Sequence, residues 1–374
     1  MSVARNAVEL TRSLLRFDTI NPTSTERDCA EHLAGLLEAG GFAVARHEFA
    51  PGRASLVART GAGARPALCF AGHIDTVPLG TAAWAHDPFR GEVDGDRLYG
   101  RGASDMKSGV AAFVTAALDV AREAPSTDLE LVIVAGEETG CEGSAHLART
   151  AGALGRAGAL VVAEPTGNEP LVGHKGALWL RARTRGVTAH GSMPERGVNA
   201  IYKAARAVSS LEKHRFGVAP DPLLGAPTLN VGTIAGGLNV NSVPDQATVG
   251  IDIRTIPAQR NDDVRAELQR LLGPEVELST VIDVGALRTP AEDPWVQGLF
   301  EVVAARTGER PTARGAPYFT DASVLTPAFG DVPTVILGPG EIAQCHQTDE
   351  YCHIHKIEEA VELYRELARR WARP

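Results

Sequence analysis

The chain has 374 residues, more than one hydrophobic core usually serves, so two domains or one large domain with an insertion are expected. Hydrophobic residues make up 44% and charged residues 22%, and no stretch approaches the roughly 20 apolar residues of a membrane span, which argues against a membrane protein. A formal net charge of -9 without a basic stripe makes nucleic acid a poor partner.

The chain begins with apolar residues near helical spacing, interrupted by Arg and Glu, over residues 3–16. This pattern predicts the first helix of a mature protein and not the continuous apolar core of a signal peptide, so we expect a cytoplasmic protein. Five cysteines are scattered along the chain without a CxxC pair. They argue against a disulfide framework and against a cysteine-bound structural zinc.

Helices and strands alternate over the first 170 or so residues, which indicates α/β architecture. Helices are expected up to about Arg16 and over 26–39 and 107–123, and strands over 42–49 and from Ala67, Leu129 and Gly158. The last three strands are apolar runs that end in polar or acidic residues. Buried central strands of a mostly parallel sheet have this pattern, because they deliver side chains to their carboxyl ends.

After Lys175 the pattern changes to amphipathic strands with two helices, in the order β-α-β-β-α-β. That order matches the split βαβ plan of a ferredoxin-like α+β domain. From about Pro290 the chain returns to a helix, a strand and a final helix. The sequence therefore predicts a discontinuous larger domain over 1–174 and 288–374, and an inserted domain over 175–287.

Several predicted strand ends and loops carry side chains that commonly bind metal ions: His73, Asp75, Asp105, Glu137, Glu138, Glu164 and His346. In a strand, residues two apart face the same side, so Asp75 can reach the ring nitrogen of His73 that does not bind metal. Adjacent Glu137 and Glu138 point in opposite directions if the chain is extended there. One of them could then bind a metal while the other faces the reacting water.

Each of these motifs has a plainer explanation when taken alone. A single His-x-Asp at a strand end is more often a satisfied polar pair, and Gly-Glu-Glu can be a solvated turn. The coincidence is harder to explain this way, because three apolar strands all end in His or carboxylate. Burying several carboxylates together is prohibitive unless cations neutralise them, so metal ions are the natural expectation.

The same motifs resemble those of the acetylornithine deacetylase and succinyl-diaminopimelate desuccinylase family of two-zinc peptidases, which includes carboxypeptidase G and the aminoacylases. The resemblance spans nearly the whole chain and rests on ordered motifs: FAGHIDTVP, WAHDPFRGEVDGDRLYGRGASDMKSG, GEETGCEGS, AEPT, HGSMPERGVNAI, DIR and GPGEIAQCHQTDEY. It implies a catalytic domain with a central, mostly parallel sheet and an inserted ferredoxin-like lid and dimerisation domain. It also implies a cis peptide bond between Asp105 and Met106.

The resemblance further implies two divalent metal ions per subunit, Zn²⁺ with Co²⁺ or Mn²⁺ as substitutes. The implied ligands are His73 and Glu164 on one ion, Glu138 and His346 on the other, and Asp105 bridging both. Glu137 would be the general base that takes a proton from a water acidified by the ions. Of the two acidic residues that follow His346, Glu350 is the better candidate to orient that ligand.

By resemblance, His190 of the inserted domain stabilises the oxyanion and reaches the active site of the partner subunit. Its plainer reading is a surface histidine near a turn. Asn241 and Arg254 are candidates for binding the substrate carboxylate, since an Arg fork pairs with a carboxylate at two points, although Arg254 could equally form a structural salt bridge. By the same resemblance Thr320 and Asp321 would lie near the substrate end, with Thr320 as a candidate substrate contact and a helix N-cap as the alternative for both. Six histidines belong to no ligand motif: His32, His47, His146, His214, His353 and His355.

Within the family, PYFTDASVL and GPGEIAQCHQTDEY look closest to acetylornithine deacetylases. We therefore expect hydrolysis of N-acetyl-L-ornithine to ornithine and acetate, in amino-acid metabolism and arginine biosynthesis, by a homodimer formed through the inserted domain. A dipeptidase, a carboxypeptidase or a succinyl-diaminopimelate desuccinylase would need the same metals. A non-catalytic metal-binding protein on this fold is a further alternative, against which the retained Glu137 argues.

Overall fold

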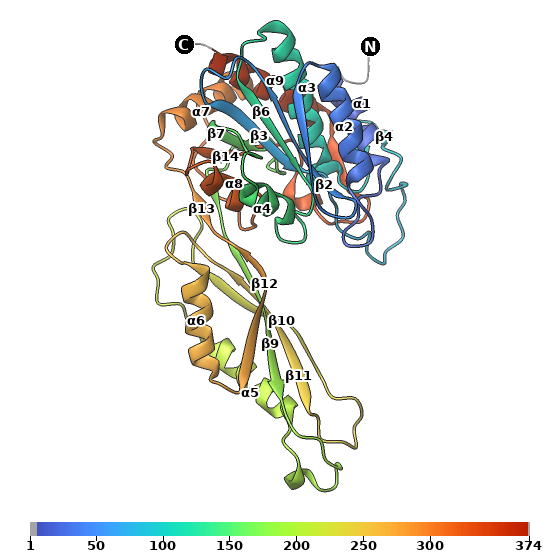
Figure 1. Ribbon diagram of the computed structural model, residues 1–374, viewed down its shortest axis with the longest axis vertical. Helices are drawn as coiled ribbons and strands as arrows, with labels where there is room; N and C mark the ends of the chain where they lie inside the picture. Colours follow the sequence, from blue (N-terminus) through green and yellow to red (C-terminus); the bar gives the residue numbers. More distant parts are fainter. Residues whose placement is uncertain (1–5, 373–374) are drawn as a thin grey trace. The chain divides into compact units, whose positions relative to one another are not determined.

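A computed structural model describes residues 6–372, which form two compact units (Figure 1). Unit 1 comprises the described residues up to 173, residues 288–314 and the described residues from 320 onward, and unit 2 comprises 174–287 and 315–319. The first helix, expected over residues 3–16, begins at Ala7, where the Asn6 side chain caps it, and residues 1–5 lie outside the described range. None of the helices over residues 6–372 is long and apolar enough to cross a membrane.

Unit 1 is built on a six-stranded sheet with the order β1-β2-β6-β3-β7-β14. Its strands are β1 (Ala43–Ala50), β2 (Arg53–Thr60), β3 (Ala67–His73), β6 (Leu129–Val134), β7 (Ala157–Val162) and β14 (Thr334–Ile336). Strands β6, β3, β7 and β14 are parallel, whereas β2 and β1 extend the sheet in antiparallel fashion. The expected α/β class with a central, mostly parallel sheet is confirmed.

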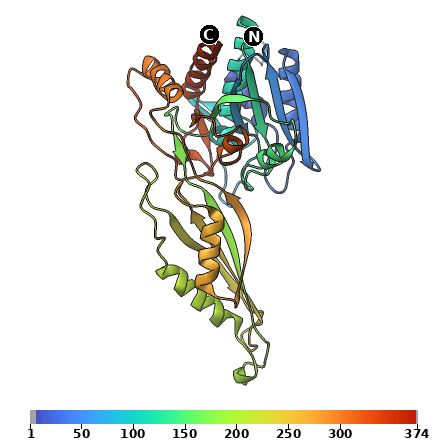
Figure 2. The same cartoon turned by 60° about the vertical axis from the view of Figure 1, so that its left-hand side comes forward.

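Helices flank this sheet (Figure 2). They are α1 (Ala7–Leu15), α2 (Arg27–Ala39), α3 (Ser108–Glu123), α4 (Glu142–Arg149), α7 (Pro294–Thr307), α8 (Ala322–Ala328) and α9 (Ile354–Ala372). Helix α3 is almost entirely buried, because its run of Ala and Val packs on β3 and against α1 and α9. A small sheet joins β4 (Glu92–Asp94), β5 (Arg97–Tyr99) and β15 (Tyr351–His353), and two short turns are η2 (Ala103–Lys107) and η4 (Ile342–Gln344).

Unit 2 contains a four-stranded antiparallel sheet with the order β10-β11-β9-β12. Its elements are β9 (Ala177–Arg185), η3 (Pro194–Arg196), α5 (Ala200–Lys213), β10 (Thr228–Gly236), β11 (Gln246–Arg254), α6 (Asn261–Leu272) and β12 (Val276–Val284). Alternate residues of β11 are buried and form a core with α5 and α6. The expected ferredoxin-like order of elements is confirmed. Two further short strands, β8 (Gly173–His174) and β13 (Leu287–Arg288), pair with each other.

Two features of the fold differ from the sequence-based expectations. The strand β2 was not anticipated, and it pairs on both sides, with β1 and β6. Residues 315–319 were expected in the larger domain, but they group with unit 2. Contacts with unit 2 explain this grouping. The Lys175 backbone N–H donates to the Ala316 backbone oxygen at 3.0 Å, and the centroids of the Phe319 and Trp179 rings lie 6.5 Å apart.

Candidate metal and catalytic site

Polar residues that follow the parallel strands β3, β6 and β7 meet at one edge of the unit 1 sheet. His73 ends β3, Glu137 and Glu138 follow β6, and Glu164 follows β7. His73, Glu137 and Glu164 are buried, and their ligand atoms lie within 4.8 Å of one another. The ligand atoms of His73, Asp105 and Glu138 form a second such group. The two groups share only His73, so they describe adjoining sites.

Asp105 and His346 complete this arrangement. His73 Nε2 lies 3.1 Å from Asp105 Oδ1 and 3.8 Å from Glu164 Oε1. His346 Nε2 lies 3.5 Å from Asp105 Oδ2 and 3.2 Å from Glu138 Oε1. Asp105 therefore faces one imidazole with each of its oxygens. The residues expected to bind metal lie together in what we call the strand-end cluster: His73, Asp105, Glu138, Glu164 and His346.

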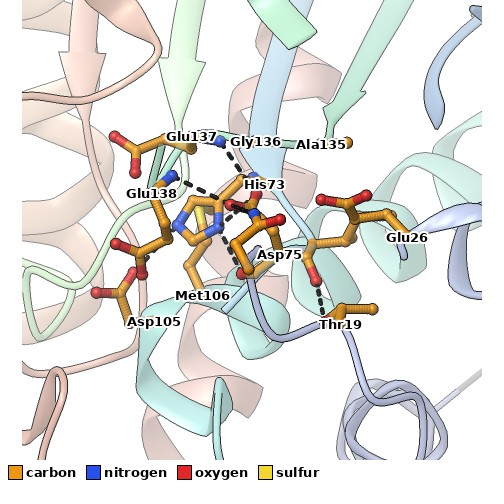
Figure 3. A network of polar contacts seen from close by, with 12 residues as sticks. Thr19, Glu26, His73, Asp75, Asp105, Met106, Ala135, Gly136, Glu137 and Glu138 are labelled. Carbon is orange, nitrogen blue, oxygen red and sulfur yellow. Dashed lines mark hydrogen bonds and ion pairs between the residues drawn. The ribbon is translucent and has the colours of Figure 1, made fainter. Parts of the chain in front are cut away.

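Asp75 connects the end of β3 to the turn after β6 (Figure 3). Its carboxylate lies 3.5 Å from His73 Nδ1, which is closer, at 3.0 Å, to the Asp75 backbone oxygen. The same carboxylate accepts hydrogen bonds from Asn21 Nδ2 at 2.6 Å and from the backbone N–H groups of Glu137 and Glu138, each at 3.1 Å. Asp75 thus holds His73 with Nε2 toward the strand-end cluster, and it also fixes the turn.

Glu137 and Glu138 are not extended, as they would be in a strand. Strand β6 ends at Val134, and the two residues lie in a turn whose backbone N–H groups both point to Asp75. They still separate as expected, because Glu137 belongs to the group with Glu164 and Glu138 to the group with Asp105. The turn, and not strand alternation, produces this separation.

Asp105 lies in η2, and its position is set by Glu350. The expected cis peptide bond between Asp105 and Met106 is confirmed. The fully buried Glu350 carboxylate accepts backbone N–H groups of Gly102, Ser104 and Asp105 at 2.8–3.1 Å, and its charge is paired with Arg101 at 2.6 Å. Glu350 therefore orients the segment that carries Asp105, whereas the sequence suggested that it orients His346.

The electrostatics of the strand-end cluster favour added positive charge. Burial, with Glu164 nearby, raises the pKa of Glu137 well above its usual value, and burial likewise raises the pKa of Glu164. Contacts with Asp105 and Glu138 raise the pKa of His346 to about 10. Buried carboxylates beside two imidazoles are the donor set of a divalent cation site, and a cation would remove the cost of ionising these acids.

The candidates in unit 2 lie on its surface or at a strand end. His190 and Asn241 are exposed and lie on neighbouring segments, since the Gly191 backbone N–H donates to Asn241 O at 2.7 Å. Arg254 ends β11 and pairs with Asp252 through two nitrogens, at 2.9 and 3.2 Å. Its guanidinium also lies over the rings of Trp179 and Phe319, within 6 Å. Arg254 thus forms a salt bridge, and its role toward a substrate carboxylate stays a prediction.

Comparison with known proteins decides the family. Residues 69–370 match the model of peptidase family M20/M25/M40. The chain belongs to this family. Among curated members, the acetylornithine deacetylase of Proteus mirabilis (strain HI4320) is 31% identical over 96% of this chain and 95% of its own length, and that of Klebsiella pneumoniae (strain 342) is 32% identical over 95% of each. The chain is therefore related to hydrolases along nearly its whole length.

Solved structures of the M20 family share the fold. An M20 family metallo-carboxypeptidase from Sulfolobus solfataricus superposes with a TM-score of 0.84, at 19% identity over 98% of this chain and 99% of the other. A dinuclear metal binding peptidase from Bacillus subtilis superposes with a TM-score of 0.70, at 16% identity over 97% and 96%. At these identities the likeness concerns the fold alone.

Thr320 and its neighbour Asp321 are both fully buried in unit 1. The Thr320 hydroxyl accepts the Ala322 N–H at 3.1 Å, which is the local contact of a helix start, and its role as a substrate contact stays a prediction. Asp321 accepts a hydrogen bond from Ser144 Oγ at 2.6 Å, and burial raises its pKa to about 6. The sequence placed Asp321 near the substrate end, with a helix N-cap as the alternative. Its burial near Glu137 was not predicted, because the two residues belong to segments far apart in the chain.

Proposed function

We propose that the chain is a dinuclear metal amidohydrolase that removes the acetyl group from N-acetyl-L-ornithine. The observation that carries the proposal is the convergence of the strand-end cluster on one sheet edge beside the buried Glu137. The curated relatives named acetylornithine deacetylase, which align over nearly the full chain, support an N-acyl amino acid as substrate. This activity belongs to amino-acid metabolism and arginine biosynthesis, and we place it in the cytoplasm.

The strand-end cluster fits two divalent ions. His73 and Glu164 would hold one ion and Glu138 and His346 the other, and Asp105 has one oxygen toward each imidazole. Mixed imidazole and carboxylate ligation suits Zn²⁺, with Co²⁺ or Mn²⁺ as substitutes. When bound, such ions lower the pKa of water and polarise the carbonyl that is attacked.

Glu137 is the proposed general base. Its carboxylate is buried within 4.8 Å of the ligand atoms of His73 and Glu164, so it faces the place where water and substrate would meet. It would accept the proton of the attacking water and pass that proton to the leaving amine. Burial and Glu164 raise the pKa of Glu137, which suits a group that must both accept and release a proton.

Unit 2 would supply substrate contacts. His190 Nδ1 accepts the Ser192 N–H at 3.2 Å, so the neutral ring carries its proton on Nε2 and can donate it to an oxyanion. Asn241, on the neighbouring segment, and Arg254 are the proposed contacts of the substrate carboxylate. Arg254 would have to exchange Asp252 for that carboxylate, which a two-point guanidinium pair permits.

A homodimer formed through unit 2 accompanies this proposal. Strand β10 is an edge strand with mostly exposed residues. Apolar side chains are also exposed on this unit, with Tyr202 66% exposed and Leu238 almost completely exposed. Open strand edges and apolar surface are features that a second copy commonly covers. We propose that His190 acts in the active site of the partner subunit.

Amine release from a substrate panel tests the activity. Purified, Zn²⁺-loaded protein would be assayed with N-acetylornithine, N-succinyl-diaminopimelate, N-acetylcitrulline, other N-acyl amino acids and several dipeptides. We expect the highest kcat/KM for N-acetylornithine. A higher value for dipeptides would make the protein a peptidase with the same machinery. Absence of turnover on the whole panel by metal-loaded protein would favour a non-catalytic binding role.

A further inference from the structure

A second group of histidine and carboxylate side chains lies on unit 1, outside the strand-end cluster. It consists of Asp96 in the turn between β4 and β5, His353 at the end of β15 and His355 in the first turn of α9. We call it the peripheral cluster. Its three ligand atoms lie within 4.8 Å of one another, although they come from three different elements.

The two oxygens of Asp96 have different partners. Oδ1 accepts the backbone N–H of His355 at 3.1 Å, and the Asp96 backbone oxygen accepts that of Ile354 at 2.8 Å, so this side of the residue caps α9. Oδ2 faces the imidazoles instead, 3.0 Å from His353 Nδ1 and in contact with His355 Nδ1. The oxygen that does not cap the helix, Oδ2, is therefore the one that both ring nitrogens contact.

The far side of His353 faces an acidic residue and an aromatic ring. Its Nε2 lies 4.0 Å from Glu341 Oε1, and its ring packs edge-on against Tyr351, with centroids 5.3 Å apart. Histidines that bind metal commonly have a carboxylate at the other ring nitrogen, which fixes the tautomer and the ring orientation. Tyr351 thus packs against the His353 ring, and Glu341 lies near its other nitrogen without a hydrogen bond to it.

We propose that the peripheral cluster is a third divalent-cation site of the Zn²⁺ type, with His353 Nδ1, His355 Nδ1 and Asp96 Oδ2 as ligands. Two imidazoles and one carboxylate are a usual protein ligand set for Zn²⁺, with water in the remaining position. The side chains are partly exposed, from 24% for His353 to 58% for His355. Binding at this site requires both histidines to be neutral.

An ion at this position would restrain a segment that matters for the proposed function. His346 and Glu350 both lie in the chain between Glu341 and His353. An ion held by Asp96, His353 and His355 would join the end of this segment to the β4–β5 turn and to α9. This consequence rests on the proposed role of His346, whereas the cation site itself does not.

Zn²⁺ stoichiometry tests the site. Full-length protein and the variants Asp96→Asn and His355→Gln would be dialysed against rising buffered free Zn²⁺ concentrations, and bound zinc would be counted by mass spectrometry. Asn keeps an oxygen that can cap α9 but loses the carboxylate charge, so it separates capping from metal binding. We expect the wild type to bind one ion more than either variant at the upper concentrations.

His47→Gln, a histidine on β1 outside the peripheral cluster, is the matched control and should bind as much zinc as the wild type. Equal zinc content in wild type, Asp96→Asn and His355→Gln at every free concentration would overturn the third site. Ions in the strand-end cluster are counted in His355→Gln itself. Fewer than two ions per chain in His355→Gln would count against the proposed function. The peripheral site would still be tested by the difference in zinc content between the wild type and the variants.

Discussion

The strand-end cluster and the candidate residues of unit 2 differ in how their own unit supports them. His73 is held by Asp75, and Asp105 is placed by Glu350, so the cluster is oriented before any ligand arrives. In unit 2, by contrast, His190 is exposed and Arg254 is paired with Asp252. The proposed ligands all lie in unit 1, whereas the roles proposed for His190 and Arg254 require a substrate or a second copy of the chain.

The largest effect should come from the buried region. Glu137→Gln keeps the shape of the side chain but cannot take up the water proton, so we expect kcat to fall roughly 10³-fold. Metal content, measured by mass spectrometry, should not change, because Glu137 is not a proposed ligand. Glu169→Gln, at an exposed carboxylate paired with Arg314, is the control and should keep full activity. Unchanged turnover of Glu137→Gln would place the base elsewhere.

A smaller loss of rate is expected in unit 2. His190→Ala removes an exposed donor, so kcat should fall on the order of 10²-fold while the melting temperature stays the same. Mixing this variant with Glu137→Gln should restore part of the activity if His190 acts in the partner subunit. If the mixture recovers no activity, His190 does not act in the partner subunit.

Glu350→Gln tests whether the orientation of Asp105 matters. The substitution leaves the buried Arg101 without its ion-pair partner and replaces one acceptor of backbone N–H groups with an amide. We expect a loss of about 3 kcal/mol in the free energy of unfolding and a drop in metal affinity of about tenfold to hundredfold. Denaturant unfolding and zinc titration measure these effects. If the variant has the unfolding free energy and the zinc affinity of the wild type, Glu350 does not hold Asp105 in place.

The smallest effect concerns the pH dependence of stability. Burial raises the pKa of Asp321 from 3.8 to about 6 in the folded protein, so its contribution is fully present below the unfolded pKa and is lost as pH rises through about 6. Asp321→Asn resembles the protonated acid. The stability of wild type relative to this variant should therefore fall by up to about 3 kcal/mol between roughly pH 4 and pH 6. The free energy of unfolding of chelator-treated wild type and Asp321→Asn would be measured against pH. Curves that run parallel between roughly pH 4 and pH 6 would contradict this prediction.

The sequence predicted those parts of the site that depend on local pattern. The apolar runs that became β3, β6 and β7 were visible because buried parallel strands lack polar alternation, and their carboxyl ends share one sheet edge. His73 and Glu164 could therefore be placed together from the sequence. Asp105 and His346 were noted as side chains that commonly bind metal, but only the resemblance to a known family assigned them to the two ions.

Contacts between distant segments were not predictable. Glu350 and Asp105 are separated by 245 positions, and nothing near either residue indicates their hydrogen bond. Strand β2 was missed because its sequence, RASLVART, neither alternates regularly nor forms a continuous apolar run, and it is held in place by pairing with β1 and β6. His353 and His355 lacked a ligand motif because Asp96 lies far from them in the chain.

Anomalous diffraction from active, zinc-loaded crystals would locate the metal ions. We expect two metal peaks in the strand-end cluster, one bound by His73 and Glu164 and the other by Glu138 and His346, each roughly 2 Å from an oxygen of Asp105. Full activity in crystals without any metal peak among these five residues would contradict this expectation.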